Sequence, residues 1–278
     1  MRIGRCSVAR LHSFDAGTSS MPSLTDQIAL ITGAGSGIGR ATAIAFARAG
    51  ASMLLAGRRM APLEETAQAA RDLGARVEIR SVDLEDGESA AALGRDALET
   101  MGRIDVLVNN AGHSTKVRSL RHVEPADFTS VFNVNVNGVY RLTQSVIGSM
   151  VARESGTVIS VASMAALNPS LLGGVPYASA KAAEIAMMRG LNAECRSHGV
   201  RACSIIPAEV NTPILDNRPT PPDDAARATM MQPEDVAEAI LLCAAMPGRT
   251  LVEQIVMMPT RPRDTSAELA RAAQGPAT

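Results

Sequence analysis

Near its N-terminus the chain reads Ile28-Ala-Leu-Ile-Thr-Gly-Ala-Gly-Ser-Gly-Ile-Gly39, and this stretch predicts the local structure around which the rest folds. Residues 28–32 form an apolar run of the length and type of a buried strand. Four glycines follow within seven residues. Beyond them, Ile38, Ala41, Ala45 and Phe46 have the spacing of one helix face. The stretch therefore predicts a strand, a tight loop and a helix.

The four glycines, at positions 33, 35, 37 and 39, indicate a role in phosphate binding. Glycine permits tight turns, and a backbone without side chains can approach a pyrophosphate closely. The N-terminus of the following helix stabilises negative charge. A structural turn without a ligand is the alternative, but glycines placed between a strand and a helix favour dinucleotide binding.

The rest of the chain continues to alternate apolar strand patterns with helical ones. Further strands are predicted at residues 52–56, 76–82, 104–108, 157–162, 201–206 and 253–258, and further helices at 62–73, 125–153, 176–198 and from 233 onward. Strands separated by helices cross over into a parallel sheet that is covered on both faces. We predict a single-domain α/β fold, a doubly wound parallel sheet of about seven strands (Rossmann fold), with ligands bound at the carboxyl ends of the strands.

The two ends of the chain fall outside this pattern. Residues 1–22 are rich in Ser and Arg and lack the apolar segment of a secretory signal. A disordered extension or a misassigned start is favoured there over a weak transit peptide. The predicted domain covers 23–260. Residues 261–278 are interpreted as a C-terminal tail with helical spacing over 266–273.

The composition of the 278 residues excludes several classes of protein. A net charge of −1 gives no basic field for nucleic acid, and no apolar run reaches the roughly 18 residues that span a bilayer. Four cysteines and four histidines are scattered without the spacing of metal ligands or of a disulfide framework. We expect a soluble, cytoplasmic protein that holds no metal and binds neither nucleic acid nor membranes.

A second motif, Tyr177-Ala-Ser-Ala-Lys181, follows Ser163 by fourteen residues and is predicted to lie on a helix. Side chains four residues apart share a helix face, so the phenol and the ammonium can point into the same space. A cation within about 4–6 Å favours a phenolate and lowers the pKa of a tyrosine. The pattern predicts an acid–base pair. An ordinary solvated helix is the alternative, and the glycine loop favours the pair.

The residues after the second predicted strand indicate which dinucleotide binds. NAD sites usually place an acid there for the ribose hydroxyls, whereas this chain has Gly57-Arg58-Arg59. A carboxylate would repel a 2′-phosphate, and a guanidinium holds one by charge-assisted, forked hydrogen bonds. The sequence favours NADP(H) over NAD(H). A solvent-facing arginine pair at a helix start is the alternative.

Five motifs in this order resemble the short-chain dehydrogenase/reductase superfamily, in its NADP-preferring form. They are Thr32-Gly33-x-x-x-Gly37-x-Gly39, Asn109-Asn110-Ala111-Gly112, Ser163, Tyr177-x-x-x-Lys181 and Ile206-Pro207. The resemblance covers about residues 24–260 and implies hydride transfer between nicotinamide and a carbonyl or secondary alcohol. One departure is Ala208, where the family commonly has glycine after the proline.

The resemblance implies catalytic roles for four residues. Tyr177 would act as general acid and base, Lys181 would lower its pKa and hold the nicotinamide ribose, and Ser163 would orient the substrate oxygen. Asn135 would support a water-linked proton path to the lysine, although a shift of two residues would place a neighbouring asparagine there. The structural alternative for Asn135 is an asparagine bonded only locally.

Cofactor contacts are implied in the same way, in addition to those of Tyr177 and Lys181. They are Gly33, Ser36, Gly37 and Ile38 at the pyrophosphate, Arg58 and Arg59 at the 2′-phosphate, Asp83 and Leu84 at the adenine, Asn110 and Ala111 at the adjoining ribose, and Pro207, Val210 and Thr212 at the nicotinamide.

The small-molecule substrate is less constrained by the sequence. We predict a mainly apolar pocket lined by residues 113–117, 164–172 and a Pro-rich lid at 211–228, with Ile214, Leu215 and Met230 as its apolar members. Arg218 is interpreted as a surface residue in preference to an anion contact. The segment 209–219 resembles family members that act on small hydroxy acids, serine-like alcohols or 3-oxoacyl compounds.

Two other functions are alternatives. A catalytically idle dinucleotide-binding sensor would keep the glycines without the acid–base residues, which this chain retains. A sugar epimerase or dehydratase would need a larger C-terminal domain than the residues after 206 provide. The resemblance also implies a homodimer or homotetramer, in which the helices at 125–153 and 176–198 pair across two-fold axes.

Overall fold

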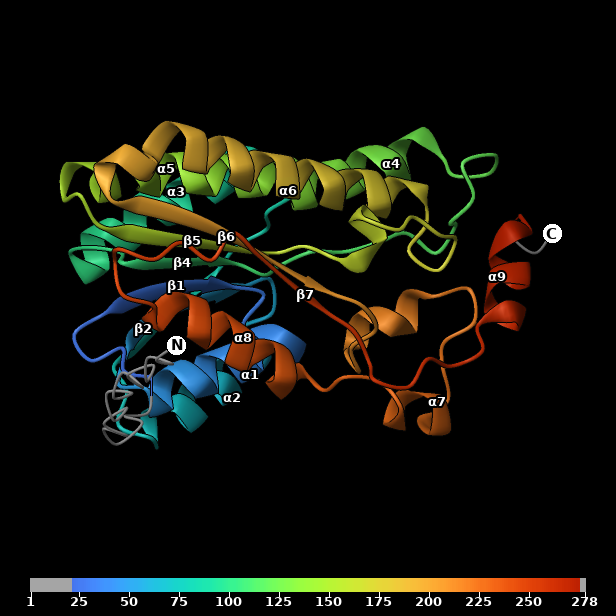
Figure 1. The fold of residues 1–278 in the computed structure, drawn as a ribbon, viewed down its shortest axis with the longest axis horizontal. Coiled ribbons are helices and arrows are strands. Elements are labelled where there is room, and N and C mark those ends of the chain that lie inside the picture. The colour runs from blue at the N-terminus through green and yellow to red at the C-terminus, as the bar shows by residue number, and fades with distance from the viewer. Residues whose placement is uncertain (1–21, 276–278) are drawn as a thin grey trace, which may run out of the picture.

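A computed structural model describes residues 22–275 of the chain. The predicted N-terminal extension, apart from Pro22, lies outside the described residues. Seven strands form one sheet (Figure 1). They are β1 (Ile28–Thr32), β2 (Ser52–Gly57), β3 (Val77–Ser81), β4 (Val106–Asn109), β5 (Gly156–Val161), β6 (Val200–Pro207) and β7 (Gln254–Met257).

The strands are ordered β3-β2-β1-β4-β5-β6-β7, and every neighbouring pair is parallel. In the centre of the sheet, Leu30 of β1 lies opposite Leu54 of β2 and Leu107 of β4. The chain moves outward from β1 to β3 and then returns to the other side of β1, so the strand order reverses there. The predicted doubly wound Rossmann fold is confirmed, and a ligand crevice is expected at the carboxyl ends of β1 and β4.

Helices cover both faces of the sheet (Figure 1). One layer consists of α1 (Gly37–Arg48), α2 (Met60–Arg71) and α8 (Pro233–Ala245), and the other of α3 (Gly87–Met101), α5 (Val139–Ala152) and α6 (Val175–Cys195). Side chains alternate along each strand, so Ile31 packs into the core that contains Phe46 of α1, whereas Leu30 packs into the core that contains Leu142 of α5. Each face therefore has its own apolar core.

The predicted helix over 125–153 is three segments in the structure. α4 (Pro125–Phe132) leads into a π-helical turn, Asn133–Gly138, which continues into α5. Asn135 Nδ2 donates to the Val131 carbonyl at 2.8 Å, and this is the acceptor that a regular α-helix gives to the backbone amide of Asn135. The side chain thus competes with the backbone ladder, which is consistent with the wider turn.

The sequence-based prediction gives no residue range for helix α3. Asp86 caps it by accepting the Glu88 amide at 3.0 Å and the Ser89 hydroxyl at 2.6 Å. An Asp before a Glu in the first turn is a helix-start signal, but the Ala-rich stretch that follows has a weak periodic pattern.

The remaining elements gather mainly beyond the carboxyl ends of the strands. They are short 3₁₀ turns at Met164–Ala166, Arg196–His198 and Pro213–Asn217, with α7 (Asp224–Ala228) and α9 (Ser266–Ala273). α7 and α9 lie at the right end of Figure 1. Arg121 Nη2 donates to the Ala273 carbonyl at 3.1 Å and holds the end of α9 against the loop before α4. Within residues 22–275, none of the helices combines the length and apolar character that crossing a bilayer requires.

Candidate active site

A cavity of about 610 Å³ opens at the carboxyl ends of the strands. Its wall contains every residue predicted to bind the cofactor and three of the four predicted catalytic residues. They are Gly33, Ser36, Gly37, Ile38, Arg58, Arg59, Asp83, Leu84, Asn110, Ala111, Ser163, Tyr177, Lys181, Pro207, Val210 and Thr212. The fold brings these separate motifs into one site.

The glycine loop packs against the end of β4 so closely that side chains are excluded. Gly33 has a φ of +65°, and a Cβ on Gly39 would lie 2.3 Å from the Gly33 carbonyl oxygen. Asn110 Nδ2 donates to the Thr32 carbonyl at 2.9 Å, while Thr32 Oγ1 accepts the amides of Asn110 and Ala111, both at 3.1 Å. The loop therefore presents bare backbone to the cavity at the start of α1, which suits a phosphate.

Arg58 and Arg59 follow β2 in the wall of the same cavity, and both are exposed. In the described part of the chain, neither guanidinium forms an ion pair with a carboxylate. Asp83, two residues beyond β3, accepts the Glu85 amide at 3.0 Å. Two unpaired cations on the cavity wall are available to an anionic ligand.

Ser163 and Tyr177 reach the cavity from two different segments. Ser163 follows β5, and its Oγ accepts the Ala165 amide at 3.2 Å. Tyr177 lies in the first turn of α6. A Cβ on Gly173 would lie 2.8 Å from the Ala165 Cβ, so this glycine lets the start of α6 approach the turn after Ser163. Lys181 Nζ lies 5.7 Å from the centroid of the Tyr177 ring, which places the ammonium beside the phenol.

Lys181 also has a partner that is not predicted from the sequence. Its Nζ lies 2.6 Å from Glu184 Oε1 and donates to the Val161 carbonyl at 2.9 Å. Ser160 Oγ donates to Glu184 Oε2 at 2.6 Å. Lys181 is 2% exposed and Glu184 is 0% exposed. The two carboxylate oxygens are thus contacted by an ammonium and a hydroxyl inside the protein.

The charges of this pair depend on each other. Burial works against the positive charge of Lys181, but the carboxylate of Glu184 and the phenol of Tyr177 together outweigh burial and raise the pKa of Lys181. Burial also raises the pKa of Glu184, against the opposing effect of the ammonium. The i, i+3 spacing on α6 is the signal in the sequence by which the pair could be found.

Asn135 lies behind Gly112, outside the cavity wall. Its Nδ2 donates to the carbonyls of Val131 and His113 at 2.8 and 2.9 Å, and its Oδ1 has no hydrogen-bond partner within the described residues. A Cβ on Gly112 would lie 2.6 Å from Asn135 Oδ1 and 3.3 Å from Lys181 Nζ. An unused acceptor and the ammonium thus face the same bare backbone. The water-linked proton path between them stays a prediction.

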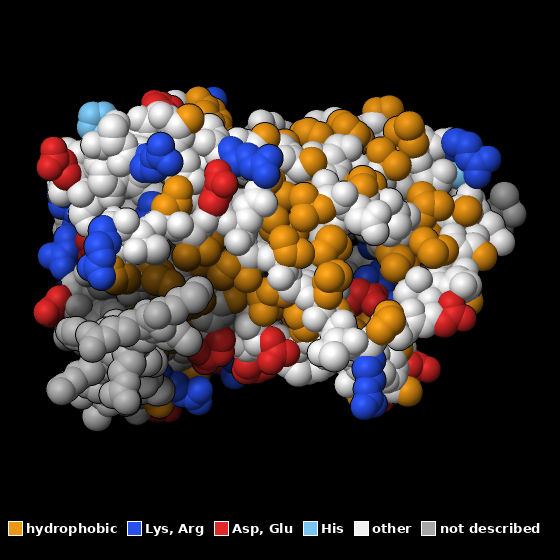
Figure 2. Space-filling view, in the orientation of Figure 1, with side chains coloured by type: hydrophobic (Ala, Val, Ile, Leu, Met, Phe, Trp, Pro, Cys, Tyr) orange, Lys and Arg blue, Asp and Glu red, His pale blue; other side chains and the backbone are white. Residues whose placement is uncertain are grey.

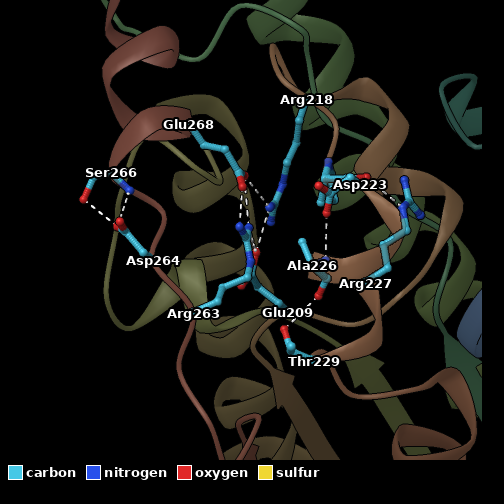
Figure 3. A network of polar contacts seen from close by, with 11 residues as sticks. Glu209, Arg218, Asp223, Ala226, Arg227, Thr229, Arg263, Asp264, Ser266 and Glu268 are labelled. Atoms are coloured by element: carbon cyan, nitrogen blue, oxygen red, sulfur yellow. Dashed lines mark hydrogen bonds and ion pairs between the residues drawn. The ribbon is translucent and has the colours of Figure 1, made fainter.

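Arg218 is part of a partly buried charge network, and because its side chain is 11% exposed, its interpretation as a surface residue is wrong. Its Nη1 lies 2.7 Å from Glu209 Oε1 and 3.1 Å from Glu268 Oε2. Arg263 pairs with the same two carboxylates, at 2.6 Å for Glu209. Glu209 follows β6, Arg218 follows the turn at 213–217, and Glu268 lies in the first turn of α9 (Figure 3). The network therefore joins the lid segment to the C-terminal segment.

This network predicts a response to acid. Burial opposes the charge of Glu209, but Arg263 and Arg218 outweigh burial and hold the pKa of Glu209 below its usual value of 4.5. A carboxylate with a depressed pKa contributes stability that is present above its unfolded pKa and lost as the pH falls through the folded one. We expect α9 and the lid to lose protection from amide hydrogen exchange only below about pH 4.5. Glu209→Gln should show the same loss at pH 7.

The matched control for this experiment is Glu234→Gln, which removes an exposed acid from the first turn of α8, away from the network. We expect it to leave the exchange of α9 unchanged. Equal protection of α9 in the wild type and in Glu209→Gln would show that the network does not hold this segment.

The substrate side of the cavity differs in part from the prediction. Ile214 and Leu215 line it, but Met230 is buried away from the cavity wall. Of residues 113–117, only His113 and Ser114 contribute to the wall. Arg118, one residue beyond the predicted lining, lies in the wall and is buried. The sequence gives no sign of this burial, because an arginine in a loop is normally solvated.

Comparison with curated proteins places the chain among oxidoreductases. Its sequence matches the short chain dehydrogenase family over residues 27–222. It is 33% identical over 240 residues to sepiapterin reductase of Chlorobaculum tepidum, covering 84% of this chain and 96% of the relative. It is 30% identical over 240 residues, with the same two shares, to the 3-oxoacyl-[acyl-carrier-protein] reductase of Thermotoga maritima.

Solved structures give the same result for the fold. The closed form of serine dehydrogenase complexed with NADP⁺ is similar with a TM-score of 0.77 and 27% identity, over 85% of this chain and 97% of that chain. A metagenomic short-chain oxidoreductase in complex with NADP is similar with a TM-score of 0.74 and 27% identity, over 86% and 99% of the two chains. The family match extends over most of the chain, and the fold and motif order agree with it, so this protein belongs to the short-chain dehydrogenase family.

Proposed function

We propose that this chain is an NADP(H)-dependent oxidoreductase that moves hydride between nicotinamide and a carbonyl or secondary alcohol carbon. Tyr177 is its general acid and base. The observation that carries the proposal is the meeting of the glycine loop, the Arg58–Arg59 pair and Tyr177 with Lys181 in a single cavity. A sensor that does not catalyse a reaction would not require the Tyr177–Lys181 pair.

The residues present fit a phosphorylated dinucleotide. The bare backbone from Gly33 to Gly39, where a side chain would collide, would hold the pyrophosphate, and Arg58 with Arg59 would hold a 2′-phosphate. Asp83 lies beyond β3 and Pro207 lies in β6, so the two residues belong to opposite parts of the cavity wall. Contacts to the adenine and to the nicotinamide, at the two ends of the dinucleotide, require such a separation. When bound, the nicotinamide supplies or accepts the hydride.

The side chains of this protein manage the oxygen and its proton. In reduction, negative charge develops on the carbonyl oxygen, and hydrogen bonds from Ser163 and Tyr177 stabilise it there. Tyr177 gives its proton to that oxygen in reduction and takes it back in oxidation. Lys181 keeps its positive charge at neutral pH because Glu184 and Tyr177 outweigh the effect of burial and raise the pKa of Lys181. A permanent cation beside the phenol stabilises the negative charge that develops on the reacting oxygens as the proton moves.

The cofactor preference can be tested at the arginine pair. We expect Arg58→Ala/Arg59→Ala to raise KM for NADPH by about tenfold to a hundredfold, because hydrogen bonds to charged groups contribute about 1.5–3 kcal/mol each and exposure reduces this. KM for NADH should change little. Arg48→Ala, an exposed arginine in the last turn of α1, is the matched control. An equal change in KM for both cofactors would contradict the role of the pair.

The substrate is proposed to be a small 3-hydroxy acid or a 3-oxoacyl compound, together with its oxidised or reduced partner. The support is the likeness to a 3-oxoacyl-[acyl-carrier-protein] reductase and to serine dehydrogenase. The test is consumption of NADPH and of NADH with a panel of aldehydes, ketones, oxo acids and 3-oxoacyl thioesters. Activity with none of them, together with tight NADPH binding, would favour the sensor.

We further propose a homodimer or homotetramer. Within residues 22–275, β7 is an edge strand that pairs with β6 alone, and its neighbourhood exposes Val256 at 47% and Met258 at 64%. Figure 2 shows apolar side chains gathered across the middle of this face. An exposed apolar edge favours contact with a second chain, as do the long helices α5 and α6. Sizing with light scattering that gives a monomer mass would contradict this assembly.

A further inference from the structure

One buried cation on the substrate side of the cavity has no role in the chemistry proposed above. Arg118 is 3% exposed and lies in the same cavity wall as Ser163 and Tyr177. Across residues 22–275, no carboxylate lies within ion-pair distance of its guanidinium. Burying a charge without a counter-ion is costly, so buried charges in proteins are normally paired.

The hydrogen bonds of Arg118 leave part of the guanidinium free. Nη1 donates to the Ser114 hydroxyl and, at 2.8 Å, to the Gly173 carbonyl, while Nη2 donates to the Asn217 carbonyl at 3.1 Å. Nε is buried and has no partner among the described residues. Of five N–H hydrogens, three are used by neutral acceptors. The two that are left belong to Nε and Nη2, which share one edge of the planar group.

The surrounding structure fixes this guanidinium instead of neutralising it. Its three acceptors come from the loop after β4, the residues before α6 and the lid turn at 213–217. Gly174, with a φ of +78°, has no Cβ, and one placed there would lie 2.8 Å from Arg118 Cδ. The side chain is therefore packed against the start of α6, and Tyr177 lies in the first turn of that helix.

Two arginines in this wall differ in whether a carboxylate neutralises them. Arg218 is balanced by Glu209 and Glu268. Arg118 has no such acid, and burial together with repulsion from Arg218 lowers the pKa of Arg118 to about 10, although Tyr177 works in the other direction. The Arg118 guanidinium is still charged at neutral pH. Arg118 therefore leaves an uncompensated positive charge in the wall that it shares with Ser163 and Tyr177.

We infer that Arg118 binds a carboxylate of the substrate through its free Nε–Nη2 edge, so that the substrate is an oxo acid or hydroxy acid and not its ester or thioester. This inference rests on the proposed function and narrows it. A carboxylate supplies the missing counter-charge and matches the geometry of two N–H donors on one edge. Shielding from water strengthens the interaction and makes it selective, since a neutral analogue leaves the cation unpaired.

The first test needs only the wild-type protein. Each acid in a series of 3-oxo and 4-oxo acids with four to eight carbons is compared with its methyl ester, with NADPH as the reductant. We expect kcat/KM for the best acid to exceed that of its ester by on the order of a hundredfold, mainly through KM. Equal or better reduction of the esters throughout the series would overturn the inference.

The second test assigns the preference to one side chain. Arg118→Gln should reduce the acid-to-ester ratio of kcat/KM by on the order of a hundredfold, and Arg118→Lys, which keeps the charge without the fork, should reduce it less. Arg48→Gln, an exposed arginine on α1 outside the cavity wall, is the matched control and should leave the ratio unchanged. A ratio that survives in Arg118→Gln, or that falls equally in Arg48→Gln, would overturn the assignment.

Binding without turnover separates this inference from the proposed reaction. Calorimetric titration of the best acid and its ester into NADP⁺-loaded Tyr177→Phe measures affinity in a protein that lacks the acid–base residue. We expect the acid to bind and the ester to bind far more weakly. In the Arg118→Gln/Tyr177→Phe variant, we expect the acid and the ester to bind with equal affinity. Acid binding through Arg118 without any reduction by the wild type would contradict the proposed function only. Equal reduction of acid and ester would contradict only the carboxylate site.

Discussion

Replacing Tyr177 with Phe is expected to lower kcat by about a hundredfold or more, because general acid–base catalysis contributes typically 10²–10⁴-fold. A hundredfold corresponds to about 2.7 kcal/mol of barrier. The variant keeps the aromatic ring that packs near Gly173 but loses the proton and one hydrogen bond to the substrate oxygen. KM for NADPH should change little. The measurement is steady-state oxidation of NADPH with the best substrate of the panel.

The chain offers a matched control for this substitution. Tyr140, its other tyrosine, lies on α5, is exposed, and its hydroxyl accepts Gln144 Nε2 at 2.8 Å. Tyr140→Phe removes the same atom from a residue outside the cavity wall and should leave kcat unchanged. If Tyr177→Phe kept most of the wild-type kcat, the phenol would not be the proton carrier.

Lys181→Met is expected to destabilise the fold as well as abolish most activity. It leaves Glu184 buried without its cation, and breaking one partner of a buried pair costs about 3–5 kcal/mol. Burial raises the pKa of Glu184, so the orphaned carboxyl will tend to take up a proton. A carboxyl whose pKa is higher in the folded than in the unfolded protein binds a proton more readily in the folded state. The free energy of unfolding therefore falls as the pH rises above the unfolded pKa, so the destabilisation should grow above about pH 4.5. Urea unfolding of the variant at several pH values measures this.

The double variant Lys181→Met/Glu184→Leu separates stability from chemistry. Replacing a whole buried ion pair with apolar side chains is often neutral or stabilising. We expect the double variant to regain most of the free energy of unfolding lost in Lys181→Met, and to remain as inactive as the single variant. Recovery of activity along with stability would show that Lys181 acts only by holding Glu184.

The sheet and the glycine-loop side of the cavity are largely predictable from the sequence. Strands of a parallel sheet buried on both faces are continuous apolar runs, so β1 and β5 can be located without tertiary information. The loop from Gly33 to Gly39 is equally visible, because its conformation admits few other residues. The π-helical turn at Asn133–Gly138 is not visible, since it depends on a side chain that competes for one carbonyl.

The substrate side depends on partners far apart in the chain. Arg118 becomes a buried cation only when Gly173 and Asn217 enclose it. Arg218 is neutralised by Glu268, fifty residues later, in a segment that the sequence suggests is a tail. Such long-range pairings have no local pattern, whereas the Lys181–Glu184 pair, three residues apart, has one. Distance along the chain decides which part of this site can be predicted.

A crystal structure of the protein with NADP⁺ and an oxo acid tests the proposed site most directly. We predict the pyrophosphate over the backbone of Gly33 to Gly39, the 2′-phosphate at Arg58 and Arg59, and the substrate oxygen within hydrogen-bond distance of Tyr177 and Ser163. A dinucleotide bound in this crystal with its nicotinamide turned away from Tyr177, or a 2′-phosphate without an arginine contact, would contradict the function proposed for this cavity.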